Sequence, residues 1–176
     1  MGELIVRAST EADVARCVEI YGHHVLNGTA SFEVEPPDLA EMGRRRAAVL
    51  DLGLPHLVAE RDGRMLGYAY AGNWRPRPAY KFSVEDSIYI DKDAVGQGVG
   101  KALLPALIEH CTALGKRQMV AVIGDSAQTP SIRLHASCGF ERVGTLKNIG
   151  FKFGRWLDSV LMQRELGSGH SASPVT

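Results

Sequence analysis

The chain has 176 residues, of which 45% are hydrophobic and 23% are charged. These proportions predict one globular domain with a real core, and the length is too short for two large domains. Twenty basic residues balance twenty acidic ones, so the bulk charge gives no sign of a nucleic-acid or membrane partner.

The three cysteines, Cys17, Cys111 and Cys138, are far apart and lie in apolar helical contexts. This pattern predicts buried thiols in a reducing compartment, and neither a disulfide framework nor a metal site. The sequence has no N-terminal apolar segment of the signal-peptide type and no run of about 18 apolar residues. We therefore expect a cytoplasmic protein.

The first part of the chain predicts a strand, two helices and a two-stranded hairpin. Thr10 stands in capping-box spacing with Asp13 at the start of the first helix, and Asn27-Gly28 ends that helix. The dipeptide Asp62-Gly63 is typical of a hairpin turn. The expected elements are strand 4–7, helix 10–27, helix 38–50 and strands 56–60 and 65–71.

A loop stiffened by proline follows the hairpin. Pro76 and Pro78 fix its backbone and present Arg75 and Arg77 two residues apart. The two guanidinium groups are either solvated on a rigid turn, or they form a clamp for a carboxylate or another oxyanion.

The next segment, 83–90, is predicted to be the central strand. Alternation places Glu85 on one face together with Ser87 and Tyr89, while Asp86 points to the other face. A glutamate on a strand is usually solvated, but one that lies beside an amine can take its proton. Glu85 is the best candidate base because it precedes a turn with anion-binding features.

That turn, Val95-Gly96-Gln97-Gly98-Val99-Gly100, opens a helix expected at 102–114. Its glycines let backbone N–H groups approach an anion, and the helix start adds partial positive charge. Glycines of this kind also occur at helix starts without a ligand. A P-loop would need Ser or Thr where the chain has Ala102, and a Rossmann loop opens a βαβ unit, whereas this strand follows a hairpin.

The remaining elements complete the sheet. Segment 118–123 is almost continuously apolar, as expected for a strand inside a sheet. A short helix begins near Gln128 and ends at Gly139, and strands at 140–146 and 156–166 close the sheet. The order βααβββαβαββ predicts an α+β fold, a mixed sheet with helices on both faces. We expect one domain at 1–166 and a disordered polar tail at 167–176.

The glycine-rich turn resembles the pyrophosphate loop of the GNAT superfamily of N-acetyltransferases, Arg/Gln-x-x-Gly-x-Gly/Ala. Both glycines match, and Val95 stands in the Arg/Gln place. The element order from about Leu4 to Leu166 is also the order of this superfamily. The resemblance implies acetyl-CoA as co-substrate and no metal. The residues it implies for the carrier are Ile88, Tyr89 and Ile90 through their backbone, the loop Val95, Gly96, Gln97, Gly98, Val99, Gly100 and Lys101, and Gln128 and Ser131.

Further segments resemble one branch, the phosphinothricin and methionine sulfoximine N-acetyltransferases. The matching segments, in order, are 71–80, 83–89, 130–135, Gly139-Phe140 and 153–158. In that branch the glutamate of the Val-Glu-x-Ser/Thr-Val/Ile-Tyr motif is thought to be the base, which implies this role for Glu85. Many GNAT enzymes have a tyrosine acid where this chain has His135, which is either the acid or a packed histidine. The branch often has Asn in place of Gln128.

The resemblance implies direct acetylation of the α-amino group of a small amino acid or analogue, such as phosphinothricin, methionine sulfoximine or methionine sulfone. Such a substrate needs a cation, polar groups for its head and a base beside its amine. The candidate substrate-binding residues are Phe32, Arg75, Pro76, Arg77, Tyr80, Glu85, Asp86 and Ser87. The alternatives are another amine, such as a polyamine, an aminoglycoside or a protein N-terminus, and a non-catalytic acyl-CoA sensor. The arginine pair argues against a polycationic substrate. We also expect a homodimer through the last strands.

Overall fold

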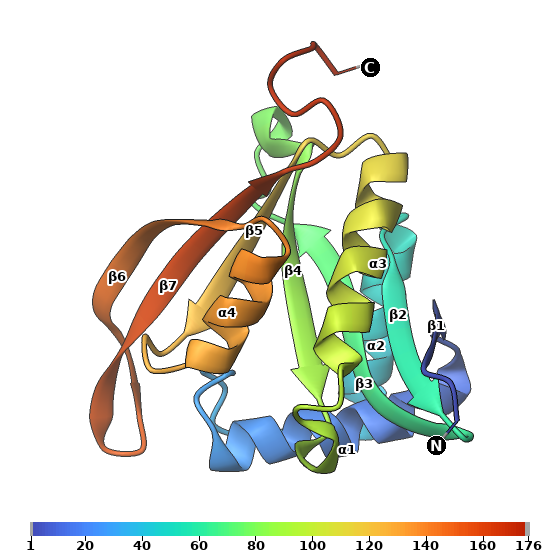
Figure 1. Cartoon of the computed structure of the whole chain (residues 1–176). Coiled ribbons are helices and arrows are strands. Elements are labelled where there is room, and N and C mark those ends of the chain that lie inside the picture. Colours follow the sequence, from blue (N-terminus) through green and yellow to red (C-terminus); the bar gives the residue numbers. More distant parts are fainter. Residues whose placement is uncertain (1, 175–176) are drawn as a thin grey trace.

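The computed structural model describes residues 2–174 and contains a seven-stranded sheet with helices on both faces (Figure 1). The strands are β1 (Ile5–Ala8), β2 (His56–Arg61), β3 (Arg64–Asn73), β4 (Ser83–Ile90), β5 (Gln118–Gly124), β6 (Glu141–Lys152) and β7 (Arg155–Glu165). The helices are α1 (Val14–Asn27), α2 (Leu39–Asp51), α3 (Val99–Ala113) and α4 (Thr129–Ser137). The predicted order βααβββαβαββ and the mixed-sheet fold class are confirmed.

The sheet separates two apolar cores. Its order is β1-β2-β3-β4-β5-β7-β6. On one face, α3 buries Leu103, Leu104 and Leu107 against the strands. On the other face, α1 and α2 pack Cys17 and Met42 against the sheet. Because helical periodicity gives each helix one apolar side, each can cover only one face of the sheet.

The parallel contact between β4 and β5 is short. Their pairing runs from Ser83 opposite Gln118 to Asp86 opposite Ala121. Beyond this point β4 continues to Ile90 and β5 continues to Gly124, but the two strands no longer pair. A gap therefore opens in the middle of the sheet, with free backbone groups at its edges.

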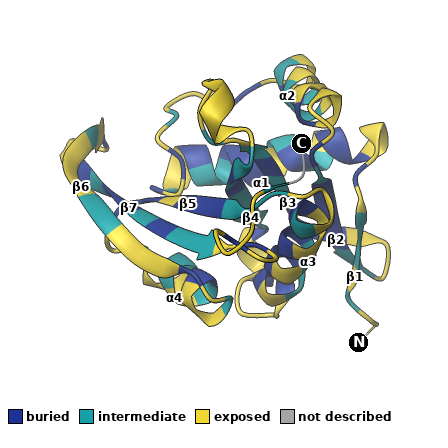
Figure 2. Cartoon of the chain, turned by 90° about the horizontal axis from the view of Figure 1, so that it is seen from above, coloured by how far each residue is buried: buried dark blue, intermediate teal, exposed yellow. Residues whose placement is uncertain are grey.

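The outer hairpin, β6 and β7, is longer than the sequence predicts. Pairing continues to Lys152 opposite Arg155, although the first strand was expected to end at 146. The register shifts between Leu146 and Gly150, and Asn148 adopts a positive φ of 53°. This irregularity interrupts the alternation on which the prediction depends. Figure 2 shows that β6 is largely exposed.

The predicted tail, 167–176, lies partly outside the described residues. Of its described part, Gly169 N–H donates to the carbonyl oxygen of Leu166 at 2.9 Å, and Ser171 N–H donates to that of Ser168 at 3.0 Å. The single domain at 1–166 stays a proposal. Within residues 2–174, no helix is long and apolar enough to cross a membrane, and no cluster of three or more potential ligands could hold a metal ion.

Asp38 caps the start of α2, where its carboxylate accepts a hydrogen bond from the Glu41 N–H at 2.7 Å. We expect Asp38→Ala to lower the free energy of unfolding by about 1 kcal/mol, because that N–H loses its partner. Urea unfolding measures the change. Asp51→Ala at the opposite end of α2 is the control, and an equal loss there would contradict the capping role.

Candidate active site

The backbone groups of β4 alternate in direction along the strand. Asp91 N–H donates to the Leu66 carbonyl of β3 at 2.8 Å, so by alternation the odd-numbered residues of β4 bond to β3. The even-numbered Ile88 and Ile90 therefore direct their backbone groups toward the gap. The backbone groups of Tyr89, which the sequence predicts for the carrier, lie on the side of β4 that pairs with β3.

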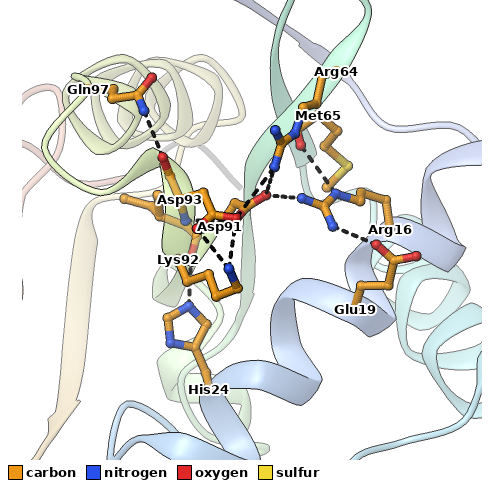
Figure 3. Close-up of polar contacts among 10 residues, drawn as sticks. Arg16, Glu19, His24, Arg64, Met65, Asp91, Lys92, Asp93 and Gln97 are labelled. Atoms are coloured by element: carbon orange, nitrogen blue, oxygen red, sulfur yellow. Dashed lines mark hydrogen bonds and ion pairs between the residues drawn. The ribbon is translucent and has the colours of Figure 1, made fainter.

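A polar cluster fixes the end of β4 (Figure 3). The buried Asp91 carboxylate accepts from Arg16 of α1, from Arg64 of β3 at 3.0 Å, and from the Asp93 N–H at 2.9 Å. Close by, His24 donates from Nε2 to the Ile90 carbonyl at 2.8 Å. Two strands and a helix thus hold the base of the glycine-rich turn.

The glycine-rich turn itself leaves backbone donors free. Gly96 and Gly98 have φ values of 81° and 84°, a conformation that favours glycine. Gly98 is the N-cap residue of α3, and no side chain bonds to the first-turn N–H groups of that helix. These groups can therefore bind an anion. A Cβ on Gly100 would lie 2.8 Å from Leu134 Cδ2, so glycine there lets α3 and α4 come together. Val95 is exposed.

A cavity bordered by β4, β5 and the first turns of α4 lies at the gap. Its lining includes Ile88, Gln128 and Ser131, which the sequence predicts for the carrier, and His135, which it predicts as the acid. Gln128 donates from Nε2 to the Thr29 hydroxyl at 3.1 Å, which leaves its amide oxygen for a ligand. We call this space the carrier cavity.

Asp86 and His135 form a buried pair that lines the carrier cavity. His135 Nε2 lies 2.9 Å from Asp86 Oδ2, and His135 Nδ1 donates to the Ser131 carbonyl at 2.8 Å. Burial lowers the pKa of His135, but the Asp86 carboxylate and the Ser131 carbonyl outweigh it and raise that pKa above 6.5. Asp86 Oδ1 is buried without a hydrogen-bond partner.

The sequence predicts Asp86 as a substrate contact, and the structure places its side chain away from that of Glu85. Its side chain is 1% exposed and is bonded to His135, on the face opposite Glu85. It is absent from the lining of the cavity that Glu85 borders. Strand alternation thus directs the two neighbouring carboxylates into different cavities.

A second cavity, of about 400 Å³, lies on the α1 side of the sheet. Glu85, Ser87 and Tyr89 line it together with Phe32. Burial, and then the neighbouring Asp86 charge, raise the pKa of Glu85 above its ordinary value, against the opposing effect of Arg75. A half-buried carboxylate of this kind is a suitable proton acceptor. We call this space the acceptor cavity.

The two cavities meet at the gap between β4 and β5. Ser87, Tyr89, Val122 and Gly124 line both of them. A molecule bound on the α4 side of the gap can therefore reach one bound on the α1 side.

The loop between α1 and α2 supplies acceptor-cavity residues that the sequence did not reveal. Glu33 lines the cavity and accepts from Arg45 at 2.6 Å and from the Tyr21 hydroxyl at 2.9 Å. The same hydroxyl lies 2.7 Å from Ser31 Oγ. No local pattern marks these residues, because their contacts connect segments that are at least ten positions apart.

The predicted arginine clamp does not line the acceptor cavity. Arg75 stacks over Trp74, 4.9 Å from the ring centre, and affects Glu85 through its charge. Pro76, Arg77 and Tyr80 are exposed on the same loop. The structure thus associates Arg75 with Glu85 and does not bring the other three residues to the acceptor cavity.

Comparison with known proteins agrees with this geometry. The model of the acetyltransferase (GNAT) domain matches residues 6–161. The chain belongs to the GNAT acetyltransferase family. This GNAT chain is 57% identical to a phosphinothricin N-acetyltransferase of Alcaligenes faecalis, over 96% of this chain and 86% of the relative. It is 39% identical to an L-methionine sulfoximine/L-methionine sulfone acetyltransferase of Salmonella typhimurium, over 93% and 95% of the two chains.

A solved GNAT structure has the same fold. It is a phosphinothricin acetyltransferase from Sinorhizobium meliloti in complex with acetyl-CoA, with a TM-score of 0.95 and 48% identity. The match covers 98% of this chain and 93% of that one. The resemblance to the phosphinothricin and methionine sulfoximine branch is thereby confirmed, and so is the N-acetyltransferase class.

Proposed function

We propose that this protein transfers the acetyl group of acetyl-CoA to the α-amino group of a small amino acid or analogue. Phosphinothricin, methionine sulfoximine and methionine sulfone are the candidate acceptors. The observation that carries the proposal is the meeting of the two cavities at the gap, with Glu85 on the acceptor side. The names of the relatives support this choice of acceptors.

The residues of the carrier side fit acetyl-CoA. The free N–H groups that follow Gly98 suit its pyrophosphate. The unpaired backbone of Ile88 and the N–H of Ile90 suit an extended arm lying along β4 in place of a neighbouring strand. When bound, acetyl-CoA supplies an acetyl group activated as a thioester.

Glu85 is the proposed general base. An α-amino group has a pKa of about 8 and is largely protonated near neutral pH, so it must lose a proton before it attacks. Transfer is direct in this proposal, because none of the three cysteines lines either cavity. Burial raises the pKa values of Cys17 and Cys111 to about 12, which keeps both of them protonated.

His135 is the proposed proton donor to the departing thiolate. It borders the carrier cavity, and its raised pKa favours the protonated ring. Since both ring nitrogens are bonded, to Asp86 and Ser131, it must give up one of these bonds to reach the sulfur.

We also propose a homodimer and a cytoplasmic location. An exposed apolar band on the outer hairpin supports the dimer, since a face of this kind suits a second copy. Its residues are Val143, Leu146, Ile149, Phe151, Phe153 and Trp156. The three free cysteines support a reducing compartment.

An acceptor screen tests the proposed reaction. Release of CoA is followed with phosphinothricin, methionine sulfoximine, methionine sulfone, the common amino acids, a polyamine, an aminoglycoside and a peptide N-terminus. We expect the three analogues to be the best acceptors. Preference for a polycation would favour another GNAT specificity, and thiol release with none of the amines would favour a non-catalytic sensor.

The pH dependence of kcat/KM should report how the positive charge of Arg75 affects the pKa of Glu85. Glu85 must be ionised to act, and its pKa is raised, so kcat/KM should fall as the pH drops through a value above 4.5. Arg75→Gln removes the positive charge that lowers this pKa and should move the acid limb to higher pH. Arg77→Gln is the control. An acid limb that responds equally to both variants would contradict the assignment.

A further inference from the structure

Phe32 borders the acceptor cavity, and its ring lies on the sheet where two strands carry no side chain. A Cβ on Gly124 of β5 would lie 2.8 Å from Phe32 Cε1, and one on Gly150 of β6 would lie 2.3 Å from Cε2. Real Cβ atoms do not come this close to other heavy atoms. Neither glycine has a positive φ, so the ring requires glycine for space and not for backbone conformation.

The backbone on the N-terminal side of Phe32 is held in place by the same strand. Lys152 is two residues beyond Gly150 and thus on the same face of β6. Its buried ammonium group donates to the carbonyl oxygens of Gly28 at 2.9 Å and Ser31 at 2.7 Å. Because these bonds fix the loop, a side chain at position 150 would have to displace the ring itself.

We propose that Gly150 is a specificity-determining residue, which acts on the acceptor through Phe32. A methyl group at this position would push the ring off the sheet and into the cavity that Glu85 borders, leaving less space for the acceptor side chain. Gly150 is therefore a positioning residue and not a catalytic one. The inference rests on the proposed function, because it takes this cavity to be the acceptor site.

The chain offers a matched pair of substitutions. The three nearest neighbours of a Cβ at Gly150 are all atoms of Phe32, whereas a Cβ at Gly144 on the same strand has nothing within 4 Å. Gly124 is less suitable, because a Cβ there would also lie 2.5 Å from the Thr29 carbonyl oxygen. Gly150→Ala is thus the test and Gly144→Ala the control.

Both alanine variants are compared in the wild-type and Phe32→Ala backgrounds, with methionine sulfone as acceptor. We expect Gly150→Ala to raise the KM for the acceptor roughly tenfold, with kcat and the KM for acetyl-CoA unchanged. Gly144→Ala should change none of these values. Gly150→Ala should add nothing when Phe32 is already alanine. An equal rise of the acceptor KM in both backgrounds would overturn the proposal.

A second readout does not depend on turnover. In protein labelled with 4-fluorophenylalanine, the resonance lost in Phe32→Ala is assigned to Phe32, and it should shift in Gly150→Ala but not in Gly144→Ala. No shift, or a shift with an unchanged acceptor KM, would refute the inference. If Gly150→Ala does not fold, recovery of folding in the double variant with Phe32→Ala supports the contact, and failure of both refutes it. Lack of turnover by the unmodified protein with every amino acid would instead refute the proposed function.

Discussion

Replacing Glu85 by glutamine is expected to lower kcat about a hundredfold or more, the usual contribution of a general base. Glutamine keeps the size of the side chain but cannot accept the amine proton. The affinity for acetyl-CoA should stay unchanged, because Glu85 lines the acceptor cavity and not the carrier cavity. Steady-state kinetics at neutral pH and calorimetric titration of acetyl-CoA measure the two effects separately.

Glu33→Gln is the matched control, since Glu33 is the second glutamate that lines the acceptor cavity. Its carboxylate is engaged by Arg45 and Tyr21, so we expect a much smaller effect on kcat. A larger loss of kcat with Glu33→Gln than with Glu85→Gln would indicate that Glu33, on the loop between α1 and α2, is the base. An unaltered rate with Glu85→Gln would remove Glu85 from the mechanism.

Asp86→Ala is expected to lower the free energy of unfolding by about 1–3 kcal/mol, because it leaves the buried His135 Nε2 without its hydrogen-bond partner. Both side chains are almost fully buried, with exposed fractions of 1% for Asp86 and 3% for His135. Urea unfolding at neutral pH measures the loss. The simultaneous replacement Asp86→Val with His135→Leu is the control, since removing both members of a buried pair is often close to neutral.

The same pair should make stability depend on pH. The folded-state pKa of His135 is raised, so its contribution is fully present below the unfolded value of about 6.5 and is lost as the pH rises through the folded-state value. The double variant should lack this alkaline loss. A single Asp86→Ala variant as stable as the wild type would show that the pair does not hold α4 on the sheet.

The order of helices and strands could be predicted because its signals are local. Asp62-Gly63 indicates the β2–β3 turn, Asp38 marks the start of α2, and the apolar run of β5 identifies an interior strand. The outer hairpin was predicted too short, because the irregular segment around Asn148 breaks the alternation. Local periodicity says nothing about a strand that continues beyond a bulge.

The site could be predicted only in part, because its contacts are distant in sequence. The alternation that put Glu85 and Asp86 on opposite faces is a property of the strand, and the structure agrees with it. The bond between Asp86 and His135 joins positions 49 residues apart. The direction of the Tyr89 backbone groups depends on the register between β3 and β4. The position of the Phe32 ring depends on Gly150 of β6. Neither follows from a single segment of the sequence.

Because β4 and β5 pair over only part of their length, the sheet has an opening between them. In the proposed reaction, the carrier would bind on the α4 side of this opening and the amine on the α1 side. Because the two binding sites lie on opposite faces of the sheet, the two substrates can bind and leave independently of each other.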